Sequence, residues 1–338
     1  MTGFIARRTL SMFFVLVAVS ALTFFFMKLI PGSPFDSEKS VEPAVRAQLE
    51  AKYNLDDPEW LQYLKYMDDL LIPRITGETI PPTSRGLVDD YLFNIPIIGT
   101  DRVLRWMNFG PSYVSPSRSV NQIFRDHLPI SAQLGVAAFI VAVVIGIPTG
   151  VAAALRRNSW IDYASMSLAL IGVSIPSIVS GPILRYIFGV QLQWVPPTGW
   201  GTFEQLILPA IALGFGSSAI LARLTRASLL QVLNEDYIRT ARAKGVKERR
   251  VITLHALKNS MIPVFTIMGP MLAALVTGTF VVEIIFGIPG LGRYFVTSIG
   301  TRDYPVIMGT TLLWGFFLVI ANLLVDILYG MLDPRIVY

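Results

Sequence analysis

Six apolar runs, separated by polar segments, dominate the pattern of the 338-residue chain. An α-helix needs about 20 mainly apolar residues to cross the hydrocarbon core of a bilayer, and each run approaches or exceeds that length. The pattern therefore predicts an all-α polytopic membrane protein with six transmembrane helices. The predicted spans cover residues 10–30, 131–155, 163–190, 206–224, 262–285 and 306–331, with kinks expected at Pro148, Pro176, Pro182 and Pro270.

A long polar segment, residues 31–129, separates the first span from the second. We expect it to be extracytoplasmic, and within it residues 49–71 to form one or two short helices. Trp60, Leu61, Leu64 and Met67 fall at helical spacing there, so their apolar stripe is expected to pack on the membrane domain. The chain thus divides into an N-terminus and first span (1–30), this segment (31–129) and a core domain (130–338), which contains five spans and a cytoplasmic loop, 225–261.

Composition and charge support a membrane protein and indicate its orientation. Hydrophobic residues make up 53% of the chain and charged residues 15%, against about a quarter in soluble proteins. The net charge of +5 has its main source in nine basic residues between positions 222 and 260. Basic loops between spans stay in the cytoplasm, which favours a membrane partner over nucleic acid and places both termini in the cytoplasm. The short loop 191–205 has no Lys or Arg and carries Trp194 and Trp200, as expected on the opposite side.

The sequence lacks the motifs of a self-sufficient pump or enzyme. It has no cysteine, two histidines and no Gly-Lys dipeptide, so it has no P-loop. We expect no catalytic, cofactor or metal site on this chain, and energy must come from an ATPase on another chain or from a coupled ion. Asn322 and Asp326 stand four residues apart in the sixth span; hydrogen bonding between helices, gating and ion coupling all remain open for them.

The cytoplasmic loop contains a well-specified short helix. Asn234 is predicted to cap its start, and Asp236 complements the positive end of the helix dipole. Arg242 and Lys244 complement the other end, and Gly245 is expected to close the helix in the left-handed conformation. Such a helix is suited to dock into a groove on a soluble partner.

Several motifs carry a resemblance to a known family. The loop segment Asp236-Tyr-Ile-Arg-Thr-Ala-Arg-Ala-Lys-Gly245 is followed by Glu248-Arg-Arg-Val and His255-Ala-Leu-Lys-Asn259. Elsewhere the chain contains Asn108-Phe-Gly-Pro-Ser-Tyr113, Gly146-Ile-Pro-Thr-Gly150, Trp194-Val-Pro-Pro-Thr-Gly199, Glu283-x-x-Phe-Gly-Ile-Pro-Gly-Leu-Gly-Arg293, Arg302-Asp-Tyr-Pro305 and Asp333-Pro-Arg335. Together they resemble the permeases of ABC importers in the dipeptide, oligopeptide and nickel branch. The poorest match, 73–107, has the character of an insertion.

The resemblance implies a type I importer fold in a bacterial or archaeal cytoplasmic membrane. It also implies a second, similar permease, two cytoplasmic ABC ATPases that bind ATP and Mg, and an extracytoplasmic substrate-binding protein. The cargo remains open among dipeptides, oligopeptides and nickel complexes. The alternative is an ion-coupled secondary transporter that works without an ATPase.

Two groups of residues receive expected roles. The ATPase-coupling helix would use Asp236, Tyr237, Ile238, Arg239, Thr240, Ala241, Arg242, Lys244 and Gly245. The Gly-rich stretch 287–292 is too rich in glycine for an ordinary helix. It is expected to form a turn, positioned by Glu283 and Arg293, that either gates the pathway or is a simple interface loop. The gate group is Glu283, Gly287, Pro289, Gly290 and Arg293, with Asn322 and Asp326 as further members for gating or packing.

Overall fold

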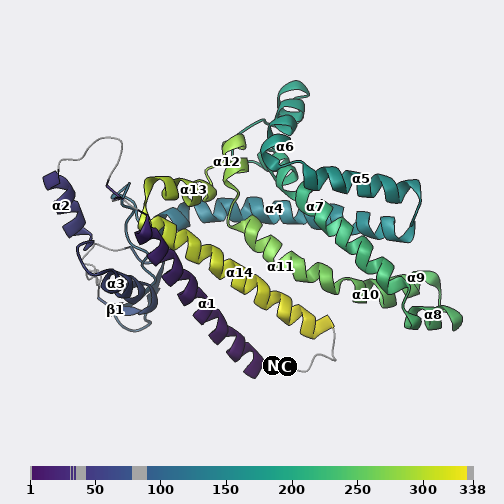
Figure 1. Ribbon diagram of the computed structural model, residues 1–338, viewed down its shortest axis with the longest axis horizontal. Coiled ribbons are helices and arrows are strands. Elements are labelled where there is room, and N and C mark those ends of the chain that lie inside the picture. Colours follow the sequence, from purple (N-terminus) through teal and green to yellow (C-terminus); the bar gives the residue numbers. More distant parts are fainter. Residues whose placement is uncertain (1, 31, 33, 36–42, 78–89, 333–338) are drawn as a thin grey trace. The chain divides into compact units, whose positions relative to one another are not determined.

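The computed structural model describes residues 2–30, 32, 34–35, 43–77 and 90–332 (Figure 1). The described chain is mostly helical, as predicted. Four helices are long and apolar enough to cross a membrane, and two bent helix pairs raise the number to six if each pair is one span. The motif Asp333-Pro-Arg335 and most of the stretch around Pro81 lie outside the described residues.

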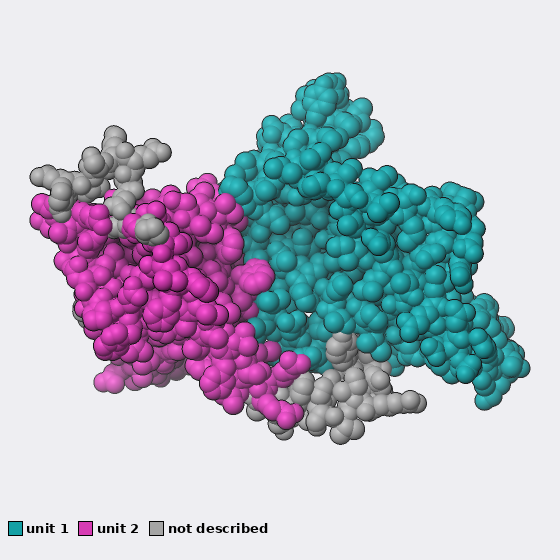
Figure 2. All heavy atoms as spheres, viewed as in Figure 1, with its two compact units in different colours: residues 1–5, 130–290, 317–338 teal, residues 6–129, 291–316 magenta. Residues whose placement is uncertain are grey.

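The chain forms two compact units, coloured separately in Figure 2. Unit 1 contains residues 1–5, 130–290 and 317–338; unit 2 contains residues 6–129 and 291–316. The helices α4 (Val120–Leu155) and α14 (Tyr304–Leu332) contribute to both. Unit 1 otherwise holds α5 (Trp160–Ser174), α6 (Ser177–Leu184), η1 (Arg185–Gln191), α7 (Phe203–Leu233), α8 (Asp236–Ala243), α9 (Glu248–Arg250), η2 (Val251–Ala256), α10 (Leu257–Ser260), α11 (Ile262–Val276) and α12 (Phe280–Phe286). Unit 2 holds α1 (Thr2–Leu29), α2 (Pro43–Lys52), α3 (Glu59–Leu71), β1 (Arg74–Thr76), β2 (Phe93–Pro96), β3 (Val103–Trp106) and α13 (Gly292–Thr301).

Unit 1 is organised around the close contact of α4 and α7. A Cβ atom placed on Gly146 or Gly150 of α4 would lie 2.5 Å from a backbone carbonyl oxygen of α7. In the reverse direction, a Cβ on Gly214 of α7 would lie 2.5 Å from a carbonyl oxygen of α4. Small residues let helix backbones approach this closely, and the resulting van der Waals contact drives helix association in lipid. The two glycines of Gly146-Ile-Pro-Thr-Gly150 therefore lie at a close contact between helices.

The structure corrects the predicted bounds of four spans. The second span begins at Val120, eleven residues earlier than predicted, because the helix continues through Pro129. The third is not continuous: α5 ends at Ser174, and the following helices bend away from it by 105° at Pro176. Pro176 disfavours the helical conformation of the residue before it, so this break fits the expected kink, whereas α4 continues through Pro148, where a kink was also expected. The fourth, predicted over residues 206–224, belongs to α7, which runs from Phe203 to Leu233 and so enters the predicted loop 225–261. The fifth span, predicted to reach residue 285, is interrupted between α11 and α12, where Gly278 has φ +97°.

In unit 2, α3 packs along α1 through only part of the predicted stripe: the Met67 Sδ atom lies 3.8 Å from the Ser20 Oγ atom of α1, and Met67 packs on the core. Trp60 and Leu64 are more than half exposed. Beside Met67 the contact uses Tyr63, whose hydroxyl lies 2.8 Å from the Oγ atom of the fully buried Ser20 of α1. Burying a hydroxyl in a helix contact requires a hydrogen-bond partner, and this pairing selects the face of α3 that turns inward. The remaining core of unit 2 is contributed by Phe24, Met27, Tyr66, Leu70, Phe109, Val120, Ile123, Phe124, Leu291, Val306, Met308 and Leu312.

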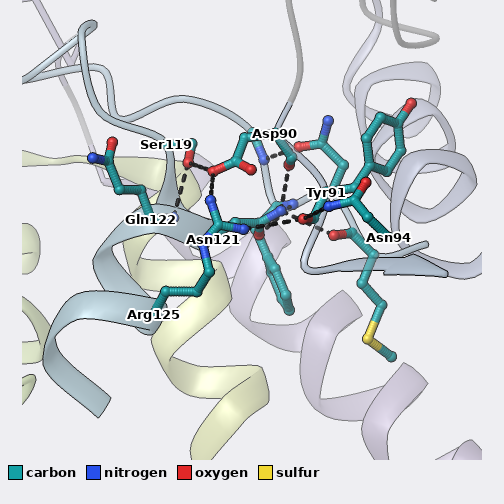
Figure 3. Close-up of polar contacts among 11 residues, drawn as sticks. Asp90, Tyr91, Asn94, Ser119, Asn121, Gln122 and Arg125 are labelled. Atoms are coloured by element: carbon teal, nitrogen blue, oxygen red, sulfur yellow. Dashed lines mark hydrogen bonds and ion pairs between the residues drawn. The ribbon is translucent and has the colours of Figure 1, made fainter. Parts of the chain in front are cut away.

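The region 73–107 contains a small antiparallel sheet, with strand order β1-β3-β2, that the irregular pattern did not predict. Figure 3 shows how polar contacts join this region to the start of α4. The buried Asn121 donates from Nδ2 to the carbonyl oxygens of Asp90 and of Met107, the latter at 3.0 Å. The Asp90 carboxylate accepts hydrogen bonds from Ser119 Oγ at 2.6 Å and from Arg125. The sheet is thereby held in a fixed orientation relative to α4.

The glycine contact generates a test. We expect Gly150→Leu to destabilise the folded protein by about 1–3 kcal/mol or more, because the added side chain would overlap the α7 backbone. The matched control is Val144→Leu, which adds volume on the same helix at a position that is 63% exposed. The apparent melting temperature of the detergent-purified protein is the measurement. Equal melting temperatures for the two variants would contradict the close contact.

Candidate functional site

The helix predicted to serve in coupling is α8, and one buried side chain holds it against the rest of unit 1. Ile238 is fully buried, while most other side chains between Asp236 and Gly245 are exposed. Ile238 belongs to a cluster that joins α8 to the ends of α4 and α7 and to η2, through Ala154, Leu229, Val251 and Ala256. A single buried apolar residue on an otherwise polar helix thus sets which face of α8 turns outward.

The end of α8 has the predicted glycine cap. Gly245 has φ +75°, and its amide donates to the carbonyl of Arg242 at 2.9 Å. The amide of Val246 donates to the carbonyl of Ala241 at 3.2 Å, which completes a Schellman motif. The predicted start of α8 is wrong: Glu235 takes the N-cap position, and the Asn234 amide instead donates to the carbonyl of Leu230 at 2.8 Å. Asn234 therefore completes the end of α7.

Polar bonds tie α8 to the segment that follows it. The guanidinium of Arg242 donates to both carboxylate oxygens of Glu248, at 3.1 and 2.7 Å. This pairing raises the pKa of Arg242 above its ordinary value. The amide of Asn259 donates to the hydroxyl of Tyr237 at 2.8 Å. The structure thus brings together the loop motifs that begin at Asp236, Glu248 and His255.

The outward face of α8 is polar and carries charges of both signs. Asp236 and Arg239 are largely exposed and form a weak contact of 3.4 Å. Thr240 and Lys244 are exposed as well, whereas Ala241 is half-buried beside Ile238. This face is open to a partner, and its backbone is held in place by the cap and by the buried isoleucine.

Sequence reasoning missed an ion pair in the same unit. The carboxylate of Asp162, at the start of α5, accepts two bonds from Arg226 of α7, at 2.5 and 2.7 Å. The Asp162 side chain is 3% exposed and also accepts a hydrogen bond from the Asn158 amide at 3.0 Å. Such fork-to-fork pairs fix relative orientation as well as distance. Opposite charges at the facing ends of the predicted third and fourth spans were the signal that could have revealed it.

The Gly-rich stretch forms the expected turn between α12 and α13. Gly287 ends α12 in the left-handed conformation, with φ +67°. The buried carboxylate of Glu283 accepts a 2.7 Å bond from Ser131 Oγ, and a Cβ atom on Gly290 would lie 2.4 Å from that carboxylate. Glu283 is therefore packed directly against the turn, so the prediction that it positions the turn agrees with the geometry.

Two further contacts hold α12 against the motif Trp194–Gly199 and against η1. The Gly199 amide donates to the carbonyl of Phe286 at 2.9 Å. The Arg185 guanidinium donates to the carbonyl of Ile285 at 2.8 Å. The end of α12 is thus bonded to two elements that are distant in the sequence.

The other predicted gate residues do not join this cluster as one group. Arg293 belongs to unit 2, where its guanidinium carbon lies 5.0 Å from the ring centroid of Tyr294. Asn322 is exposed on α14, and Asp326 is half-buried one turn further along. Among the residues that the structure describes, no group of three or more His, Asp or Glu side chains is placed to hold a metal ion.

In unit 2, two of the sequence motifs meet at Asp303. Its carboxylate accepts a hydrogen bond from Ser112 Oγ and one from the Tyr113 amide at 3.0 Å. Burial raises the pKa of the Asp303 carboxyl, and the bonds from Ser112 and Tyr113 oppose that rise. The contact joins the segment before α4 to the start of α14.

Comparison with known proteins agrees with this arrangement. Residues 146–338 match the family described as "Binding-protein-dependent transport system inner membrane component". Residues 1–83 match the N-terminal family of the same transport-system membrane components. The chain belongs to this family. Its two matches cover both the first span and the core that contains α8.

Two relatives that match the chain over nearly its whole length are permeases of peptide transport systems. The permease is 42% identical to the dipeptide transport system permease protein DppB of Bacillus subtilis, over 99% of its own length and 98% of the relative's. It is 40% identical to the oligopeptide transport system permease protein OppB of Escherichia coli, over the whole of both chains. It also resembles a chain of the MetNI methionine ABC transporter, with a TM-score of 0.51 and 19% identity over 62% of this chain and 96% of that one. The permease thus has the transmembrane fold of a type I ABC importer.

The buried ion pair generates a prediction about stability. We expect Asp162→Asn to cost about 3 kcal/mol, because Arg226 would lose its charged partner within a buried contact. The control is Glu248→Gln, which breaks the exposed Arg242 pair and should cost less than about 1 kcal/mol. Thermal unfolding of the purified variants measures both. If Asp162→Asn unfolds no earlier than Glu248→Gln, the buried pair does not hold α5 on α7.

The turn generates a second prediction. We expect Gly290→Ala to reduce transport strongly at normal abundance, because the new methyl group would displace the Glu283 carboxylate from Ser131. Gly300→Ala is the matched control, since a Cβ atom at Gly300 meets nothing within 4 Å. Uptake and membrane abundance are measured for both variants. Equal uptake would show that the contact between Glu283 and the turn is dispensable.

Proposed function

We propose that the permease forms half of the translocation pathway of an importer for small peptides, driven by ATP hydrolysis on partner chains. Relatives named as dipeptide and oligopeptide transport system permeases, matched over nearly the whole chain, support the peptide cargo. A nickel complex remains the alternative cargo. On this proposal the permease is a transport subunit without catalysis of its own. It binds no cofactor, and ATP and Mg are held by the ATPases.

The observation that carries the coupling role is the way α8 is mounted. Its outward face is polar and accessible, while Ile238 fixes it to the ends of α4 and α7. A helix held in this way moves with α7 when a partner pushes on it. Closure of an ATPase dimer beneath α8 would therefore shift α7, and with it α5 through the Asp162–Arg226 pair.

The proposed assembly contains a second, similar permease, two ATPases and an extracytoplasmic substrate-binding protein. Both termini and the α8 loop lie in the cytoplasm, in keeping with the nine basic residues between positions 222 and 260 and with the absence of Lys and Arg from loop 191–205. The membrane is the cytoplasmic membrane of a bacterium or archaeon. The turn at 287–291, held by Glu283, is proposed to lie beside the external gate.

Purification of the tagged permease from its own membranes tests the assembly. We expect a second permease and ABC ATPases to copurify, and substrate-binding protein loaded with di- or oligopeptides to stimulate ATP hydrolysis. Proteoliposomes made with the same complex then report ATP-dependent peptide uptake. A homo-oligomer that transports without an ATPase, driven by an ion gradient, would replace the proposal with a secondary transporter.

Gly245 provides a matched pair of variants for the coupling role. A β-branched residue is strained at φ +75°, whereas asparagine tolerates that conformation. We therefore expect Gly245→Val to lower peptide-stimulated ATP hydrolysis and uptake together, and Gly245→Asn to retain most of both. A Cβ atom here meets nothing within 4 Å, so any difference between the variants reports on the backbone. Normal coupled activity in Gly245→Val, at normal abundance, would contradict the role of the cap.

A further inference from the structure

The three-stranded sheet of unit 2 has one face made only of apolar side chains. In the antiparallel register, Ile75, Leu104 and Ile95 form a row across the strands, and Phe93 pairs with Trp106. Directly paired residues share a face of a sheet, as do alternate residues along one strand. All five side chains therefore lie on the same face.

That apolar face is the exposed one. Ile75, Phe93, Ile95 and Trp106 are between 37 and 59% exposed, and Leu104 in the centre is half-buried. The rings of Phe93 and Trp106 contact each other, with centroids 6.2 Å apart. A sheet in water normally buries such a face and exposes the other.

The opposite face is polar, and protein covers it at its charged residues, whereas Asn94 and Pro96 of the edge strand β2 remain exposed there. Arg74 and Arg105 are paired in register on it, and Arg105 is only 7% exposed. The Arg74 Nη2 atom lies 3.0 Å from carboxylate oxygens of Asp68 and of Asp69, and the Asp69 side chain is fully buried. The sheet thus covers its charges with protein and leaves its apolar residues outside, the reverse of the pattern in a water-soluble sheet.

The apolar face continues onto two membrane-spanning helices. Phe93 and Trp106 line a groove of about 310 Å³ whose lining residues are all apolar and include Leu16 of α1 and Phe316 of α14. The Trp106 indole N–H donates to the carbonyl of Leu71 at 3.1 Å, so its polar atom is already bonded. The groove therefore offers only apolar surface to an occupant.

The groove lies beside the two helices and below their extracytoplasmic ends. The Lys28 Nζ atom is 5.3 Å from the ring centroid of Tyr304, so those residues mark one level on α1 and α14. Leu16 lies twelve residues before Lys28 on α1, and Phe316 lies twelve residues after Tyr304 on α14. Each is therefore about 18 Å along its helix from that level. Both residues fall within the segments long and apolar enough to span a membrane. The groove therefore extends from the sheet along the part of the two helices that lipid surrounds.

We propose that this face of the sheet contacts the acyl chains of the outer leaflet and anchors the extracytoplasmic segment in the membrane interface. The strands β1 and β2 are edges, and open backbone groups are not tolerated in the hydrocarbon core. The side chains therefore enter the acyl region while the strands stay at headgroup level, as in other interfacial anchors. Trp106 suits that boundary. The choice of leaflet rests on the proposed orientation of the chain.

Spin labelling tests the anchor, because the chain contains no cysteine and accepts single labels cleanly. Ile95→Cys is labelled in the complete importer in proteoliposomes, with partner chains free of cysteine. Collision with oxygen, which concentrates in lipid, is compared with collision with a water-soluble nickel chelate. Asn94→Cys is the matched control on the same strand, with Leu22→Cys on α1 as the lipid reference and Asp101→Cys as the water reference.

We expect the ratio of oxygen to nickel collisions at position 95 to exceed that at position 94 several-fold and to approach that at position 22. A ratio equal to that at position 101 would place the face in water and overturn the proposal. Low collision rates with both reagents would show that a protein partner covers the face, which also overturns it. Phe93→Cys repeats the measurement if the label at position 95 prevents assembly.

Discussion

The close contact between α4 and α7 is the constraint on which unit 1 depends. Gly150 and Gly214 bring the two backbones within contact distance, and a side chain at either position would separate them. Because lipid tails are as apolar as the helix surfaces, this contact is held by van der Waals packing. The helix α8 follows α7 after two residues, and Ile238 packs it against the ends of both α4 and α7.

Buried polar groups define the next level of the architecture. Asp162 is held by Arg226, and Glu283 accepts a hydrogen bond from Ser131 while it packs against Gly290. A polar group in such surroundings is stable only with a partner, so each contact fixes one helix relative to another. The first lies at the start of α5 and the second at the turn after α12. Both connect elements that a rigid-body transport cycle would have to move together.

At the surface of unit 2, by contrast, a charged side chain is covered by protein and an apolar side chain is exposed. Its sheet covers Arg105 and exposes Ile95, which is stable where the surroundings are lipid and costly where they are water. Asn121 and Asp90 bond the sheet region to α4, so the orientation of the sheet is set within the unit. A segment held in this way keeps a constant position within unit 2, where α3 packs on α1.

The sequence by itself determined the helical membrane class, the family and the short helix α8 with its Gly245 cap. Those features depend on local patterns: apolar length, charge in short loops and the conformational freedom of glycine. The tertiary structure alone decided the break after Ser174, the Asp162–Arg226 pair, the face of α3 that packs on α1 and the sheet within residues 73–107. Each depends on a partner distant in the sequence, and an apolar run has the same appearance whether its helix is straight or bent. The exposed apolar face of the sheet became recognisable only once the strand register had paired Ile75, Leu104 and Ile95.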